Sequence, residues 1–248
     1  MQITRNIYLV GSGEPDLMPT DKHDSQVYLV QANSTLILID AGAGLSVDRI
    51  LANVLFHNFD PQAIRWLLLT HTHADHAGGA AELKAIIHGL RVAVSADSAD
   101  WLRDGNEQLI SLNKAQEFGL YYPPDYRFQA CDVDIELHDS QQLSLEDLRV
   151  NVISSPGHCR GHMSFMIETE GKRALFSGDA IFPNGKILLQ DIWDCNLHES
   201  LRSVERLADL HVNHLFAGHG HPVVDHAPEH FKLAIDRINN LVIPYNLI

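Results

Sequence analysis

Six residues near the end of the first third of the chain combine metal-ligating side chains at close spacing. The run is His71-Thr72-His73-Ala74-Asp75-His76. Imidazole nitrogen and carboxylate oxygen are zinc ligands, and a tight turn aims alternate side chains at one point. His71 and His73 would then hold one ion, and Asp75 with His76 a second. A histidine-rich surface turn is the alternative, because the chain contains 16 histidines.

Three further clusters join histidine or aspartate to glycine, and each directly follows an apolar run. They are Pro156-Gly157-His158, Ser177-Gly178-Asp179 and Gly218-His219. With them, one ion would have His71, His73 and His158, and the other Asp75, His76 and His219. Asp179 would bridge the two. Seven ligands leave one position open, where the pKa of a bound water drops to about 7, so the pattern predicts a nucleophile generator.

The elements that must position these residues follow from hydrophobic periodicity. Strands are predicted in the first half at 7–10, 26–30, 35–40, 64–70 and 91–95. Runs at 133–137, 148–153, 164–168, 173–176 and 214–216 predict a second sheet. Helical spacing predicts a helix after Ser46 as its N-cap, and others at 77–88, 197–210 and 228–242. The second of these begins only at the glycines that follow His76.

Residues 96–129 contain helical patches and the aromatic, proline-containing stretch Tyr121-Tyr122-Pro123-Pro124, without a strong strand. Such an insertion after a metal-binding turn predicts a lid or pocket wall, and a plain surface connection is the alternative. The length of 248 residues and the 45% hydrophobic content suit one domain over 1–248.

Charge and cysteine content exclude several classes of protein. The formal net charge is −14 and there is no Lys/Arg run, so neither nucleic acid nor an anionic membrane is expected as a partner. Three separated cysteines, an odd number, predict no disulfide framework and favour a reducing cytoplasm. We find no apolar leader and no apolar segment of 18 residues, so we expect neither secretion nor a membrane span. A small-molecule substrate is the expected partner.

Together with Leu38-Ile39-Asp40-Ala41-Gly42, these clusters resemble the five ordered motifs of the metallo-β-lactamase superfamily, over residues 36–221. The resemblance implies an α+β fold, a four-layer αββα sandwich of two mixed β-sheets flanked by helices. It also implies a dinuclear site held by His71, His73, Asp75, His76, His158, Asp179 and His219. Asp40 would accept an imidazole N–H and fix a ligand tautomer, and His162 would hydrogen-bond to a ligand or to backbone beside it.

Asp179 stands where β-lactamases proper would have cysteine. The chain is therefore more similar to glyoxalase II thioesterases, acyl-homoserine lactonases, phosphodiesterases and persulfide dioxygenases. This implies a binuclear hydrolase of a small ester, thioester or lactone, in which a metal-bound hydroxide attacks and Asp75 orients it. Two divalent ions are expected, zinc first, with iron or manganese as alternatives. A mononuclear iron enzyme of the persulfide dioxygenase type and a phosphodiesterase are the alternative functions.

Substrate contacts are predicted in the insertion and in the segment after Asp179. The candidates are Tyr121, Tyr122, Trp193 and Asp194. Lys186 lies near the position where similar thioesterases have a lysine for the glutathione carboxylate, and an ordinary surface lysine is the alternative. The sequence leaves open the substrate, the physiological metal and the oligomeric state, for which a homodimer is one alternative.

Overall fold

The apolar runs before residue 138 form one six-stranded sheet. In the computed structural model, which describes residues 1–33, 35–117 and 122–248, the chain divides into two units, 1–137 and 138–248. The strands of the first unit are β1 (Ile7–Gly11), β2 (Val27–Ala32), β3 (Thr35–Ile39), β4 (Ile64–Leu68), β5 (Arg91–Ser95) and β6 (Ile135–Leu137). They lie in this order, antiparallel from β1 to β3 and parallel from β3 to β6.

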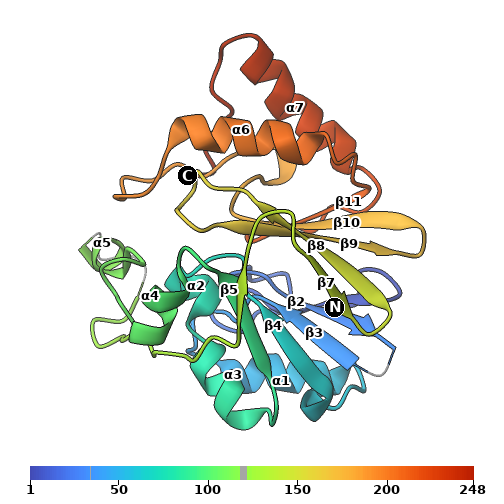
Figure 1. Ribbon diagram of the computed structural model, residues 1–248, viewed down its shortest axis with the longest axis vertical. Helices are drawn as coiled ribbons and strands as arrows, with labels where there is room; N and C mark the ends of the chain where they lie inside the picture. The colour runs from blue at the N-terminus through green and yellow to red at the C-terminus, as the bar shows by residue number, and fades with distance from the viewer. Residues whose placement is uncertain (34, 118–121) are drawn as a thin grey trace. The chain divides into compact units, whose positions relative to one another are not determined.

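The helices of the first unit form where apolar side chains recur at helical spacing. They are α1 (Val47–Phe56), α2 (Ala74–Ala77), α3 (Ala80–Ile86), α4 (Ala99–Asp104) and α5 (Leu112–Glu117), with a 3₁₀ turn at Pro61–Ala63. In Figure 1, α1 and α3 lie on the same face of the sheet. The α1 helix buries Val47, Ile50 and Val54, which share one side of a helix of 3.6 residues per turn.

The second unit holds a five-stranded sheet whose strands β8, β10 and β11 point in one direction. Its strands are β7 (Gln142–Leu145), β8 (Leu148–Ser154), β9 (Met163–Thr169), β10 (Lys172–Gly178) and β11 (His214–Ala217). β7 to β10 alternate antiparallel, and β11 pairs parallel with β10. Helices α6 (Leu197–Ala208) and α7 (Ala227–Asn239) lie on one side of this sheet, and a 3₁₀ turn spans Pro183–Gly185.

The predicted fold class is confirmed, since each unit contains a mixed β-sheet with helices beside it. The single domain over 1–248 stays a prediction. None of the described helices combines the length and apolar character needed to cross a membrane. In the insertion, Ile110, Leu112, Tyr126 and Phe128 are buried in the core of the first unit. This part of the insertion is therefore more than a surface connection.

Two predictions about strands were wrong. The run at 133–137 was assigned to the second sheet, but only Ile135–Leu137 is a strand, and it pairs with β5 in the first sheet. Alternation identifies a half-buried strand but not its partner. Here Asp134 attaches the segment to β5, since its N–H donates to Val92 O at 2.9 Å and its Oδ2 accepts the Val92 N–H at 2.7 Å. The sequence reading also missed β7, whose four residues give too short a pattern.

Two predictions about helices also need correction. A short helix, α2, already begins at Ala74, so Asp75 and His76 lie on helical backbone ahead of the glycines. Gly78 and Gly79 separate α2 from α3 instead of starting the first helix. Ser46 does occupy the N-cap position of α1, but its side chain makes no capping hydrogen bond.

Gly78 is predicted to be intolerant of a side chain. A Cβ there would lie 2.4 Å from Ala43 O and 2.5 Å from Ala74 O, although its φ of −60° suits any residue. We expect Gly78→Ala to cost about 3 kcal/mol of unfolding free energy, because backbone atoms cannot move aside as side chains do. Urea titration measures the loss. Gly89→Ala, where a Cβ meets open space, should cost about 1 kcal/mol, and equal losses would contradict the steric explanation.

Candidate metal centre

The first unit brings together its four metal-binding candidates after β4. His71 is fully buried, and its Nε2 lies 3.1 Å from Nδ1 of His73. The Thr70 hydroxyl lies 2.8 Å from Asp40 Oδ2 and 3.0 Å from His71 Nδ1. Since Thr70 donates its one hydroxyl proton to the carboxylate, its oxygen accepts the His71 Nδ1–H. The Nε2 lone pair of His71 then faces His73, as in a ligand pair.

Asp75 and His76 form a second pair on α2. His76 Nε2 lies 3.5 Å from Asp75 Oδ2. The other ring nitrogen, Nδ1, donates to Asp40 Oδ2 at 2.8 Å, in surroundings that exclude solvent. This hydrogen bond leaves the His76 Nε2 lone pair on the side of Asp75. Asp40 thus makes the contact with an imidazole N–H that the sequence predicted.

Asp40 is held in place by the backbone at the end of β3. Its φ is +62°, a left-handed conformation that aspartate tolerates better than most residues. The N–H of Thr70 donates to Asp40 Oδ1 at 2.7 Å. Because β3 and β4 are parallel, their carboxyl ends meet at one edge of the sheet, and the Asp40 carboxylate links the two ends.

In the second unit one carboxylate oxygen has two imidazoles beside it. Asp179 Oδ2 lies 3.6 Å from His158 Nε2 and 3.5 Å from His219 Nε2. Asp179 and His158 are each 2% exposed, whereas the side chain of His219 is 29% exposed, so the cluster is buried on one side and reached by solvent at His219. A carboxylate placed between two imidazole nitrogens is the geometry expected of a residue that bridges two ions.

His162 holds the backbone of Asp179. The Asp179 N–H donates to His162 Nε2 at 3.0 Å, so Nδ1 of this buried neutral imidazole carries the proton. That N–H donates to Ser155 Oγ at 2.9 Å, and Ser155 Oγ lies 2.7 Å from Ser164 Oγ. The sequence predicted a hydrogen bond of His162 to a ligand or to backbone but gave no sign of the two serines.

His158 is oriented by a carbonyl from a distant segment. Its Nδ1 donates to Leu188 O at 3.3 Å, which leaves Nε2 for the side of Asp179. The next residue, Leu189, is held at both backbone groups by Asn246, which accepts its N–H at 2.8 Å and donates to its carbonyl at 3.0 Å. No spacing rule identifies a carbonyl or an amide so far along the chain.

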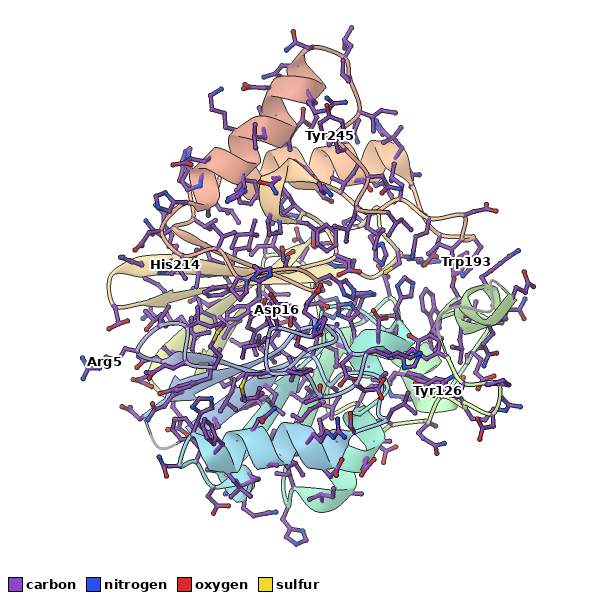
Figure 2. All side chains as sticks on the ribbon, turned by 180° about the vertical axis from the view of Figure 1, so that it is seen from behind. Arg5, Asp16, Tyr126, Trp193, His214 and Tyr245 are labelled. Carbon is purple, nitrogen blue, oxygen red and sulfur yellow. The ribbon has the colours of Figure 1, made fainter. Side chains whose placement is uncertain are left out.

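The predicted substrate residues are scattered. Tyr121 lies outside the described residues. The Tyr122 hydroxyl contacts the backbone of Asp75, and burial, with the Asp75 charge second, raises the pKa of Tyr122 well above its usual value. Trp193 lies on the loop before α6 and is 54% exposed (Figure 2). Asp194 Oδ2 accepts the Arg160 N–H at 2.9 Å, and burial raises the pKa of the Asp194 carboxyl.

Lys186 lines a cavity beside α7, and none of the metal-binding candidates lines that cavity. The sequence reading also missed His23, whose ring stacks on Tyr122 at 5.5 Å and whose Nδ1 lies 2.6 Å from Asp21. The Tyr126 ring also stacks on Tyr122, with the ring centres 4.6 Å apart. Tyr122 therefore has two aromatic neighbours in addition to its contact with the Asp75 backbone on α2.

The donor set fits divalent metal ions. Its members are imidazole nitrogens and carboxylate oxygens, which zinc prefers, and several of them group as candidate ligands. In His71 and His76 of the first unit, and separately in His158 of the second, Nε2 is left unprotonated because Nδ1–H faces an oxygen acceptor. The protein is therefore of the α+β class and carries candidate ligands for divalent metal ions.

Comparison with known proteins identifies the family. The chain matches the model of the metallo-β-lactamase superfamily over residues 20–219, and it belongs to that superfamily. It is similar to a metallo-β-lactamase of Cronobacter sakazakii with a mutated HARLDQ motif, at 27% identity and a TM-score of 0.70, covering 97% of this chain and 84% of that one. The family predicted from the motifs is confirmed.

Curated relatives point in the same direction. A β-lactamase-like protein 2 homolog of Caenorhabditis elegans is 25% identical over 85% of this chain and 60% of its own length. An atrochrysone carboxyl ACP thioesterase of Aspergillus fumigatus is 27% identical over 86% of this chain and 56% of its own. The chain thus spans about 60% or less of the length of these relatives.

Asp40→Asn is predicted to weaken metal binding without loss of shape. The amide that faces His76 Nδ1 would donate instead of accept, so the imidazole would carry its proton on Nε2, where it cannot bind a metal. We expect a 10- to 100-fold loss of zinc affinity, roughly that of other lost ligand-orienting groups. Competition with a chromogenic chelator measures it. Exposed Asp48 is the control, and unchanged affinity in Asp40→Asn would contradict the tautomer argument.

Asn246→Ala is predicted to loosen His158. It removes both side-chain hydrogen bonds to Leu189 and so frees the neighbouring carbonyl that fixes His158 Nδ1. Because it acts one step further from the ligand, we expect zinc release to chelator to rise by up to about tenfold. Asn239→Ala, at an exposed position on α7, is the control. Equal zinc-release rates in Asn246→Ala and Asn239→Ala would contradict the role of Asn246 in holding Leu189.

Proposed function

We propose that the protein is a binuclear metal-dependent hydrolase of a small-molecule ester, thioester or lactone. The observation that carries the proposal is the Asp179 carboxylate between His158 and His219, which is the arrangement of a bridging ligand. His71, His73, Asp75 and His76 would complete the set. Membership of a superfamily of generally hydrolytic enzymes supports it, as does the thioesterase name of one relative.

Two divalent ions, zinc in the first instance, would polarise a substrate carbonyl and lower the pKa of a water to about 7. The residues of the chain supply the rest. Asp75 is 22% exposed at its side chain, so one oxygen can face His76 while the other accepts a proton of the attacking water. Asp40 and the Leu188 carbonyl keep the protons of His76 and His158 on Nδ1. Tyr122, against the Asp75 backbone, keeps α2 in place.

We propose that the substrate is a small molecule, either uncharged or anionic. A net charge of −14 repels nucleic acid, which argues against a nuclease or another enzyme that grips long polyanions. Three cysteines are free thiols, which supports a reducing cytoplasm as the location. An iron-dependent persulfide dioxygenase would use the same histidines, and it is distinguished by consumption of oxygen, which a hydrolase does not require.

Asp75→Asn is predicted to abolish most turnover while the protein stays folded. The amide cannot accept the proton, so kcat should fall by about 10²–10⁴-fold. A panel of acyl thioesters, lactones and aryl esters, assayed on zinc-loaded protein, measures it. Asp48→Asn on α1 is the matched control, since it changes an exposed carboxylate of the same unit. Activity equal to wild type in Asp75→Asn, with zinc still bound, would overturn the assigned role.

A further inference from the structure

The cavity that Lys186 lines, in the unit 138–248, is built by three separate segments. Its volume is about 530 Å³, and its walls come from Asn184 to Lys186, from α7 and from the chain after α7. Gly185 is pressed on α7, since a Cβ there would lie 2.6 Å from Ala234 N. Figure 2 shows Tyr245 beside α7. The turn at 183–185 therefore packs directly on α7.

Two cationic side chains, Lys186 and Arg237, line this cavity and have N–H donors that form no hydrogen bond within the described chain. Within the described chain, the Lys186 amine makes no hydrogen bond or ion pair. The Arg237 guanidinium lies 3.8 Å from the Tyr245 ring centre, and its Nε donates to Ile243 O at 2.8 Å. That carbonyl uses one of five N–H donors of the arginine. An acid, Asp236, also lines the cavity, and its carboxylate is paired with Lys232.

The wall also carries two amides, Asn184 and Asn240, and three large apolar or aromatic side chains that are accessible to solvent. Leu233, Val242 and Tyr245 line the cavity and are 50%, 45% and 62% exposed. An apolar group placed against them would gain burial, while an oxyanion would gain hydrogen bonds from Lys186 and Arg237. The chemistry of the cavity therefore selects a small organic anion, a carboxylate or phosphonate-type group on an apolar body.

The cavity wall continues to a metal-binding candidate. Ile187, next to Lys186, donates its N–H to Tyr245 O at 3.0 Å and accepts from Leu247 N at 2.8 Å. Leu188, the next residue, accepts the Nδ1–H of His158 at 3.3 Å. A ligand bound by both Lys186 and Arg237 would hold the segment 186–189 against the chain after α7 and so restrain the Leu188 carbonyl.

We propose that this cavity binds a small organic anion through Lys186 and Arg237, and that its occupant slows the loss of metal from His158. The first part stands without the proposed hydrolytic function, and the second rests on His158 being a metal ligand. None of the metal-binding candidates lines the cavity, so its occupant is an effector and not the substrate.

Calorimetric titration of the zinc-loaded protein tests whether the cavity binds a small organic anion. The probes are phenylphosphonate and phenylacetate, with inorganic phosphate and benzyl alcohol as the anion-only and apolar-only arms. We expect the aromatic anions to bind at least about tenfold more tightly than either single-feature arm, since both kinds of contact contribute. The two anions decide between a phosphonate-type and a carboxylate ligand.

Lys186→Met removes the charge and keeps the apolar stem, and it should weaken binding of the preferred probe by about tenfold. Lys172→Met is the matched control and should bind like wild type, because Lys172 and its ion-pair partner Asp225 both lie outside the cavity lining. No binding at millimolar probe, or equal binding by wild type and Lys186→Met, would overturn the site. Self-association of the protein that removes probe binding would assign the surface to a second copy instead, which also overturns it.

Zinc release to chelator, measured with and without the preferred probe, tests the second part. We expect the probe to slow release in wild type and in Lys172→Met, and to have no effect in Lys186→Met. Binding without any change in release would overturn the effector role. Because this readout needs no substrate, a hydrolase assay that fails would leave the result interpretable.

Discussion

The candidate site depends on one constraint of β-sheet geometry, that strands running in one direction end at one edge. In the second unit β8, β10 and β11 share a direction, and His158, Asp179 and His219 follow their ends within four residues. In the first unit the parallel pair β3 and β4 ends in Asp40 and in the run from His71. Ligands far apart in sequence are thus collected without any long loop.

A second common feature is the way in which tautomers are fixed. His71, His76 and His158 each direct Nδ1 to an oxygen, which belongs to a hydroxyl, a carboxylate and a backbone carbonyl in turn. All three therefore present Nε2. His162 differs, because its Nε2 accepts a backbone N–H and its Nδ1–H is spent on Ser155. The direction of a hydrogen bond separates a candidate ligand from a residue that holds one.

Much of this could be predicted from the sequence, because it rests on local patterns. The run from His71 to His76 and the glycine-flanked His158, Asp179 and His219 pointed to the family and to the paired sheets. The partner of β6 could not be predicted, since alternation in 133–137 does not name a neighbour. The roles of the Leu188 carbonyl and of Asn246 could not be predicted either, because they arise from contacts across 30 and 57 residues. The α2 helix was hidden by its length of four residues.

Elemental analysis of the protein purified without added metal or chelator tests the central claim most directly. The account predicts about two zinc ions per chain, because three candidate ligands for each ion and one shared carboxylate would supply the donors for two zinc ions. About one iron per chain, with zinc absent, would contradict the binuclear hydrolase and point to oxygen-dependent chemistry.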